Sequence, residues 1–141
     1  LRPRDYGTGA RLVSSEIVLM MPYEKWKAWQ RSHELALAIY TETGRWPSEE
    51  RYGLIAQARR SAVSVPKNLA EGSARLGGRE LRRFADIGLG SLSELSYLLR
   101  LSRDLGYMSQ ESWSHLDLKR DAAGRLLFGL VRAIGKRRPD V

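Results

Sequence analysis

The sequence predicts an all-α fold, an antiparallel up-down-up-down four-helix bundle. Four segments carry apolar residues at alternating spacings of three and four, which is typical of one face of a helix. Short connectors containing Gly or Pro separate these segments, and no segment shows the period-two alternation of a strand. Because consecutive amphipathic helices with short connectors pack as antiparallel neighbours, the pattern favours a bundle.

The first two helices are expected at residues 23–43 and 49–71. Gly44 suits the end of the first helix, and Ser48 is a good N-cap for the second, which has two glutamates in its first turn. Pro66 predicts a kink in the second helix because it removes one backbone hydrogen bond. The expected buried positions are Trp29, Ser32, Ala36, Ile39 and Thr43, followed by Ile55, Ala58, Ala62, Val65 and Leu69.

The third helix is expected at residues 79–105, and the fourth begins at Ser109 after a C-cap at Gly106. The middle of the third seam is made of the small residues Gly88, Gly90 and Ser91. Because glycine lowers helix propensity, we expect another helix to approach closely there. The fourth seam holds Trp113, Leu116, Ala123, Leu127, Leu130 and Ile134, with Arg120 as its one polar interruption.

Residues 1–22 differ from the rest of the chain. They contain scattered Pro, Gly and Ser and show no helical period. We expect a flexible or only locally ordered N-terminal extension, either an upstream addition or the result of a start site assigned too early. Residues 23–138 are expected to form the four-helix bundle domain.

The chain is strongly basic. It has 24 Lys and Arg against 16 Asp and Glu, which gives a net charge of +8. Residues 45–76 carry six basic and three acidic side chains, residues 108–141 carry seven and four, and residues 23–44 are balanced. The excess therefore belongs to the second and fourth helices, and such a field attracts polyanions such as RNA, DNA or an acidic membrane surface. The alternative is a basic protein that binds nothing specific.

The composition excludes several classes of site. There is no cysteine, which excludes disulfides and thiolate metal sites and is compatible with a cytoplasmic location. The two histidines, His33 and His115, lie far apart, and neither follows a glutamate by three residues as in di-iron bundles. No apolar stretch is long enough to span a membrane. We expect no cofactor, no metal and no membrane association.

The sequence contains no complete catalytic motif in a suitable structural context. The stretch from Gly88 to Ser93 imitates half of a dinucleotide fingerprint, but it lies in the middle of a helix. The stretch from Gly72 to Gly78 lacks the Gly-Lys-Ser/Thr ending of a phosphate loop. Glu71 and Glu94 are expected to pair with basic groups such as Arg60 rather than to form a catalytic dyad. We predict that the protein is not an enzyme.

The four tryptophans, Trp26, Trp29, Trp46 and Trp113, are predicted to serve core or subunit-interface packing. Stacking on unpaired bases is the less favoured alternative, because stacking residues should interleave with basic ones and these mostly do not.

Several motifs together resemble a known family, the bacterial four-helix-bundle proteins encoded in intervening sequences of large-subunit ribosomal RNA genes. The accessory protein of diversity-generating retroelements is similar as well. The match extends from Tyr23 to about Ile134. The motifs are Tyr52-Gly53-Leu54, Gln57-x-Arg59-Arg60-Ser61-Ala62-x-Ser64-Val65-Pro66-x-Asn68-Leu69-Ala70-Glu71-Gly72, Glu80-Leu81-x-Arg83-Phe84, Gly90-Ser91-Leu92-x-Glu94-Leu95 and Gly106-Tyr107.

The resemblance implies a homopentamer with a basic surface. It also implies a nucleic-acid or reverse-transcriptase partner, because the retroelement relative binds both, while most members have no established activity. The motif residues that it marks as candidates for an internal polar network or for subunit contacts are Arg59, Arg60, Asn68, Glu71 and Glu94.

Charge and resemblance together favour a non-enzymatic, homopentameric protein that binds RNA or DNA largely without sequence specificity. The alternative is a protein-interaction scaffold or an accessory subunit for a nucleic-acid enzyme such as a reverse transcriptase. The candidates for phosphate contact are Arg59, Arg75, Arg79, Arg82, Arg83, Lys136, Arg137 and Arg138.

Overall fold

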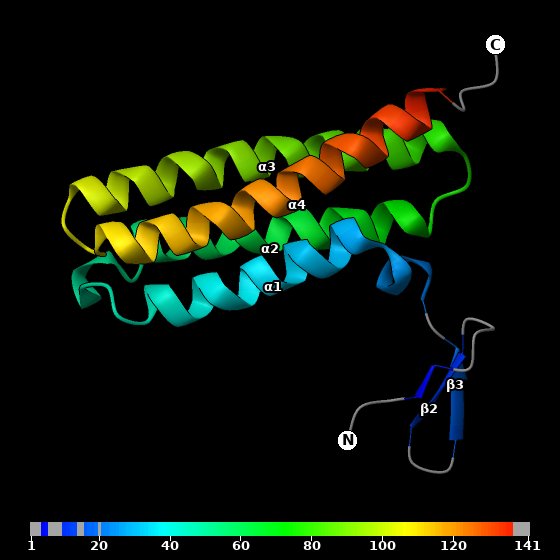
Figure 1. Ribbon diagram of the computed structural model, residues 1–141, viewed down its shortest axis with the longest axis horizontal. Helices are drawn as coiled ribbons and strands as arrows, with labels where there is room; N and C mark the ends of the chain where they lie inside the picture. The colour runs from blue at the N-terminus through cyan, green and yellow to red at the C-terminus, as the bar shows by residue number, and fades with distance from the viewer. Residues whose placement is uncertain (1–3, 6–9, 14–15, 20, 137–141) are drawn as a thin grey trace.

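The computed structural model describes residues 4–5, 10–13, 16–19 and 21–136, and within this part of the chain it confirms the four-helix bundle. The helices run in alternating directions (Figure 1). They are α1 (Lys27–Thr43), α2 (Leu54–Ser73), α3 (Gly78–Asp104) and α4 (Gln110–Lys136), with 3-10 helices η1 (Pro22–Lys25) and η2 (Ser48–Glu50) in the connections.

Each helix of the bundle packs against two neighbours, in the cyclic order α1, α2, α3, α4. The predicted seam of α2 faces the interior: Ala58, Ala62, Val65 and Leu69 are fully buried. Three hydroxyls also lie in the core, on Ser32, Thr43 and Ser102. They donate hydrogen bonds of 2.6, 2.7 and 2.8 Å to carbonyls one turn earlier in their own helices, so these three hydroxyls are satisfied.

Helices α2 and α3 approach each other closely where small residues permit it. A Cβ atom on Gly72 would lie 3.0 Å from Leu81 Cδ1 and 3.0 Å from Phe84 Cβ, so α3 lies directly against the α2 backbone there. Gly88 is buried and faces Val65 and Leu127. The prediction of close packing is wrong for Gly90, which faces open space.

Two helix starts differ from the prediction. Helix α1 begins at Lys27, because Trp26 has an extended backbone (φ −80°, ψ 126°). Helix α2 begins at Leu54, and Ser48 lies in η2 without capping it. Instead, Glu50 Oε1 accepts a 3.3 Å hydrogen bond from the Leu54 N–H, placing a carboxylate at the positive end of α2.

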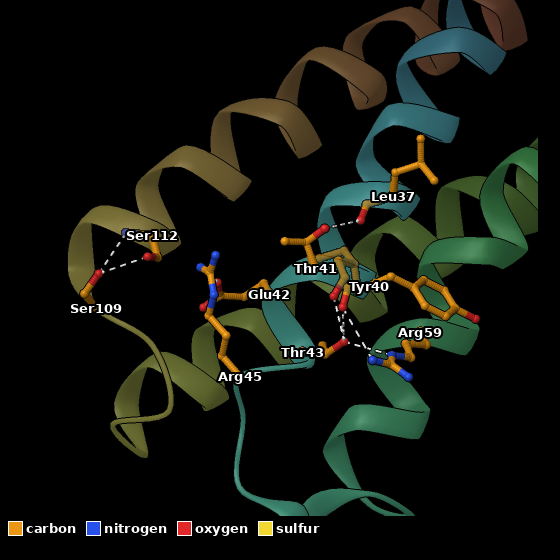
Figure 2. A network of polar contacts seen from close by, with 10 residues as sticks. Leu37, Tyr40, Thr41, Glu42, Thr43, Arg45, Arg59, Ser109 and Ser112 are labelled. Carbon is orange, nitrogen blue, oxygen red and sulfur yellow. Dashed lines mark hydrogen bonds and ion pairs between the residues drawn. The ribbon is translucent and has the colours of Figure 1, made fainter.

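The connection from α3 to α4 follows the prediction. Gly106 has a positive φ of 83°, and the Tyr107 N–H donates to the Ser102 carbonyl at 2.9 Å, which closes the end of α3. Ser109 caps α4 by accepting a 3.0 Å hydrogen bond from the Ser112 N–H (Figure 2). The Tyr107 hydroxyl donates to Glu50 Oε2 at 3.0 Å, and this bond raises the pKa of Tyr107.

The N-terminal segment contains three short strands that the sequence analysis did not predict. Strands β1 (Arg4–Asp5), β2 (Ala10–Val13) and β3 (Glu16–Leu19) form an antiparallel sheet in the order β1-β2-β3. In the described segments, none of these strands packs on a bundle helix. The expected flexibility of residues 1–22 stays a prediction, since residues 1–3, 6–9, 14–15 and 20 lie outside the described residues.

Candidate nucleic-acid interface

A basic concavity on the bundle, which we call the α2 groove, has a volume of about 670 Å³ and follows the outer face of α2. Its lining comes from α1, α2, α3 and the turn before α2: Tyr40, Arg51, Ile55, Ala56, Arg59, Arg60, Ser61, Val63, Ser64, Lys67, Ser91 and Glu94. Four of these residues are cations and one is a carboxylate. A concave surface of this charge concentrates anions.

The helical period of α2 explains why this face is basic. Arg60, Val63 and Lys67 follow one another at spacings of three and four, on the side opposite the buried seam. All three are exposed. The same segment therefore supplies the core and the cationic surface.

Arg59 is held in place by the end of α1 (Figure 2). Its Nε donates a 2.9 Å hydrogen bond to Thr43 Oγ1, and a terminal nitrogen lies 3.4 Å from the Tyr40 carbonyl oxygen. The guanidinium carbon lies 4.5 Å from the centre of the Tyr40 ring. A cation at the C-terminus of α1 also stabilises that helix through its dipole. Arg59 therefore joins α2 to α1 while still lining the groove.

The α3 side of the groove carries the hydroxyl of Ser91 and the carboxylate of Glu94. The hydroxyls of Ser64 and Ser91 lie 2.7 Å apart across the α2–α3 contact. Asn68 Nδ2 donates to the Ser64 carbonyl at 2.7 Å and to the Ser64 hydroxyl at 3.0 Å. The buried hydroxyl of Ser61 has no hydrogen-bond partner within the part of the chain that is described.

The remaining cations of the groove are weakly paired. Arg60 and Glu94 approach to 3.9 Å, with 72% and 47% of their side chains exposed, so the pair is a surface contact of small energetic value. Arg51 and Lys67 form no ion pair with any described residue. The groove thus keeps a net positive charge after its internal pairing.

The five candidates for an internal polar network differ in burial, and Arg59 among them is partly buried and hydrogen-bonded to Thr43. Asn68 is buried, but Arg60, Glu71 and Glu94 are exposed. The side chain of Glu71 forms no hydrogen bond or ion pair with the described residues, whereas that of Glu94 pairs with Arg60. The alternative role of these residues in subunit contacts stays a prediction.

A second basic region, which we call the turn cluster, lies around the α2–α3 connection and consists of Arg75, Arg79, Arg82 and Arg83. Arg75 and Arg83 lie over the Phe84 ring, with guanidinium carbons 5.5 and 5.1 Å from its centre. Glu80 and Asp86 lie 3.7 and 3.9 Å from Arg83 and Arg82.

Among the side chains that the structure describes, the predicted phosphate contacts do not form one surface. Sixteen residues separate Arg59 from Arg75, which is about 24 Å along a helix axis. Lys136 is the last residue of α4, and Arg137 and Arg138 lie outside the described residues.

Sequence reasoning missed three groove residues as binding candidates: Tyr40, Arg51 and Lys67. The position of Lys67, two helical turns after Arg60, was a usable signal. For Tyr40 and Arg51 the sequence holds no such signal, because these residues reach the groove only through the packing of α1 and of the turn before α2.

The tryptophan side chains serve packing in the bundle. Trp46 is buried, and Trp26, Trp29 and Trp113 pack against the core, which confirms the core-packing interpretation. His33 stacks on Trp29 with ring centres 5.0 Å apart, and His115 is exposed on α4. Within the described ranges, no three side chains of His, Asp or Glu gather as a metal site would require. None of the described helices combines the length and apolarity of a membrane span.

Comparisons with known proteins agree with this architecture. A crystal structure of a protein with unknown function from the S23 ribosomal protein family of Bacteroides thetaiotaomicron VPI-5482 is similar, with a TM-score of 0.70 and 20% sequence identity. The similarity covers 74% of this chain and 95% of that one. No curated protein sequence matches the chain. The family model described as 23S rRNA-intervening sequence protein matches residues 24–129, and the chain therefore belongs to this family.

Proposed function

We propose that this protein is a non-enzymatic, cytoplasmic nucleic-acid-binding protein whose main contact surface is the α2 groove. The observation that carries the proposal is the set of four cations, Arg51, Arg59, Arg60 and Lys67, around one concave surface with one carboxylate. Phosphate contacts of this kind dominate affinity for nucleic acids and are largely insensitive to base sequence.

The binding partner follows from chemistry and not from the family name alone. Arginine and lysine on a helix face match the regular negative charges of RNA or DNA. The family's association with 23S rRNA intervening sequences makes RNA the first ligand to test.

A salt titration tests this function. We expect the purified protein to bind a labelled single-stranded RNA at low salt, with a slope of log K against log salt of about −3 for four phosphate contacts. Arg60→Glu combined with Lys67→Glu should weaken binding at least about tenfold and make the slope shallower by about 1.4. Both side chains are exposed, so the variant should fold. Absence of any RNA or DNA retention at low salt would refute the proposal.

Self-association is a separate part of the proposal, supported by the resemblance, which implies a homopentamer. Large apolar side chains are also exposed on α1, α3 and α4, and such residues are covered when subunits assemble. They include Leu37, Ile87, Leu118 and Phe128. Sedimentation should give about 80 kDa, five times the 16.0 kDa of the chain, and a 16.0 kDa species at micromolar concentration would exclude the pentamer.

The same exposed apolar side chains support the second candidate function, a scaffold or accessory subunit for a nucleic-acid enzyme. Phe128, with 55% of its surface exposed, borders two concave surfaces that are lined by residues of α3 and α4. Recovery of a stoichiometric protein partner that survives nuclease treatment would favour this function over direct binding of RNA or DNA.

A further inference from the structure

Exposed tyrosines line the α2 groove or lie close in the sequence to residues that line it. Tyr40 lines it, Tyr52 directly follows the groove residue Arg51, and Tyr97 lies one helical turn from Glu94 on α3. Their exposed fractions are 47%, 88% and 62%. In contrast to the tryptophans, which pack on the core, Tyr40 lies against the basic residue Arg59, and rings beside cations are found where proteins bind unpaired bases.

Tyr40 is the ring whose position is best defined. The Arg59 guanidinium lies over it at 4.5 Å and is itself fixed by its 2.9 Å hydrogen bond to Thr43 (Figure 2). Aromatic rings and guanidinium planes both accept a stacked nucleobase. The Tyr40–Arg59 pair is therefore a flat surface at the edge of a cationic groove, held in place before any ligand arrives.

We infer that the α2 groove takes a single-stranded segment, with an unpaired base stacked on the Tyr40–Arg59 pair and the backbone phosphates on Arg60 and Lys67. This inference rests on the proposed function and narrows its ligand class. In a duplex the bases are stacked on one another and cannot reach Tyr40, so a duplex would keep the phosphate contacts and lose the stacking contact.

The test compares the affinities of four proteins for a single-stranded oligouridylate of about 12 nucleotides and an RNA duplex of the same length. The proteins are the natural chain, Tyr40→Leu, Tyr40→Phe and Phe128→Leu. Phe128 is the matched control, because Arg132 lies over its ring at 6.0 Å on α4, outside the lining of the groove.

We expect Tyr40→Leu to lower the affinity for the single strand about tenfold and to leave duplex binding and the salt slope unchanged. Tyr40→Phe, which keeps the ring, and Phe128→Leu should both behave like the natural chain. Equal losses for single strand and duplex, or no loss with Tyr40→Leu, would overturn the inference.

A measurement on the ligand side covers the case in which Tyr40→Leu fails to fold. With the natural chain, a 2-aminopurine in the single strand should lose fluorescence on binding, because stacking quenches this base. Unquenched emission from every probe position in a bound strand would also overturn the inference.

The two proposals fail differently. If the natural chain binds RNA through Arg60 and Lys67 but is indifferent to Tyr40 and shows no quenching, only the stacking site is wrong. If the natural chain binds neither ligand at low salt, the proposed function itself is wrong.

Discussion

The α2 groove and the turn cluster are both rich in arginine, but the surroundings of their arginines differ. In the groove, cations from α2 and the turn before it surround one concave surface, and Arg59 is fixed by hydrogen bonds to α1. In the turn cluster, Arg82 and Arg83 lie close to Asp86 and Glu80 on their own helix. The difference shows that a run of basic residues in the sequence is a weaker guide to a binding surface than the number of elements that converge on it.

The largest expected effect is the difference in RNA affinity between two double variants, one with two charges reversed in the turn cluster and one with two charges reversed in the α2 groove. Arg79→Glu with Arg83→Glu alters the net charge by as much as Arg60→Glu with Lys67→Glu. Since no residue of the turn cluster lines the groove, its reversal should act only through the long-range field and weaken RNA binding by no more than about threefold at about 150 mM salt, where that field is screened.

Fluorescence anisotropy with one labelled RNA measures both double variants side by side. Each substituted residue is exposed, so folding should be preserved in both. An equal loss of affinity from the two variants would mean that the protein senses net charge alone, and the distinction between the groove and the turn cluster would then have no functional meaning.

A smaller effect should separate two adjacent arginines within the groove. Arg59→Met removes the hydrogen bond to Thr43 and the contact with Tyr40, and we expect it to lower the free energy of unfolding by about 1–2 kcal/mol. Arg60→Met removes an exposed ion pair with Glu94, which should change that free energy by less than about 0.5 kcal/mol.

Urea unfolding followed by circular dichroism gives both values. The two substitutions are chemically identical and lie next to each other, so each is the control for the other. Equal stability of the two variants would show that the contact between Arg59 and α1 does not contribute to folding.

Much of the bundle could be predicted because helix faces are a local property. The seam of α2 from Ile55 to Leu69 is buried as its spacing indicates, and Gly106 ends α3 with the positive φ that only glycine adopts without strain. The errors fall where tertiary contacts compete with local signals. Ser48 has the chemistry of an N-cap, but Glu50 reaches the start of α2 instead.

The candidate site was only partly predictable. The sequence marked both Arg59 and Arg60 as candidates for a polar network. In the structure their roles differ, because Arg59 reaches the end of α1 and Arg60 faces solvent. The exposed position of Glu71 was also missed. The strands of the N-terminal segment were missed because each has four residues or fewer, too short for a clear pattern.

The sequence by itself determined four amphipathic helices, their buried faces and a strongly basic surface, because helical periodicity and charge are written in residues that are neighbours along the chain. Only the tertiary structure decided that Tyr40, Arg59 and Ser91 share one groove, since they come from three different helices. Which residues of different helices come together depends on how the side chains between the helices pack, and this packing cannot be read from any single segment of the sequence.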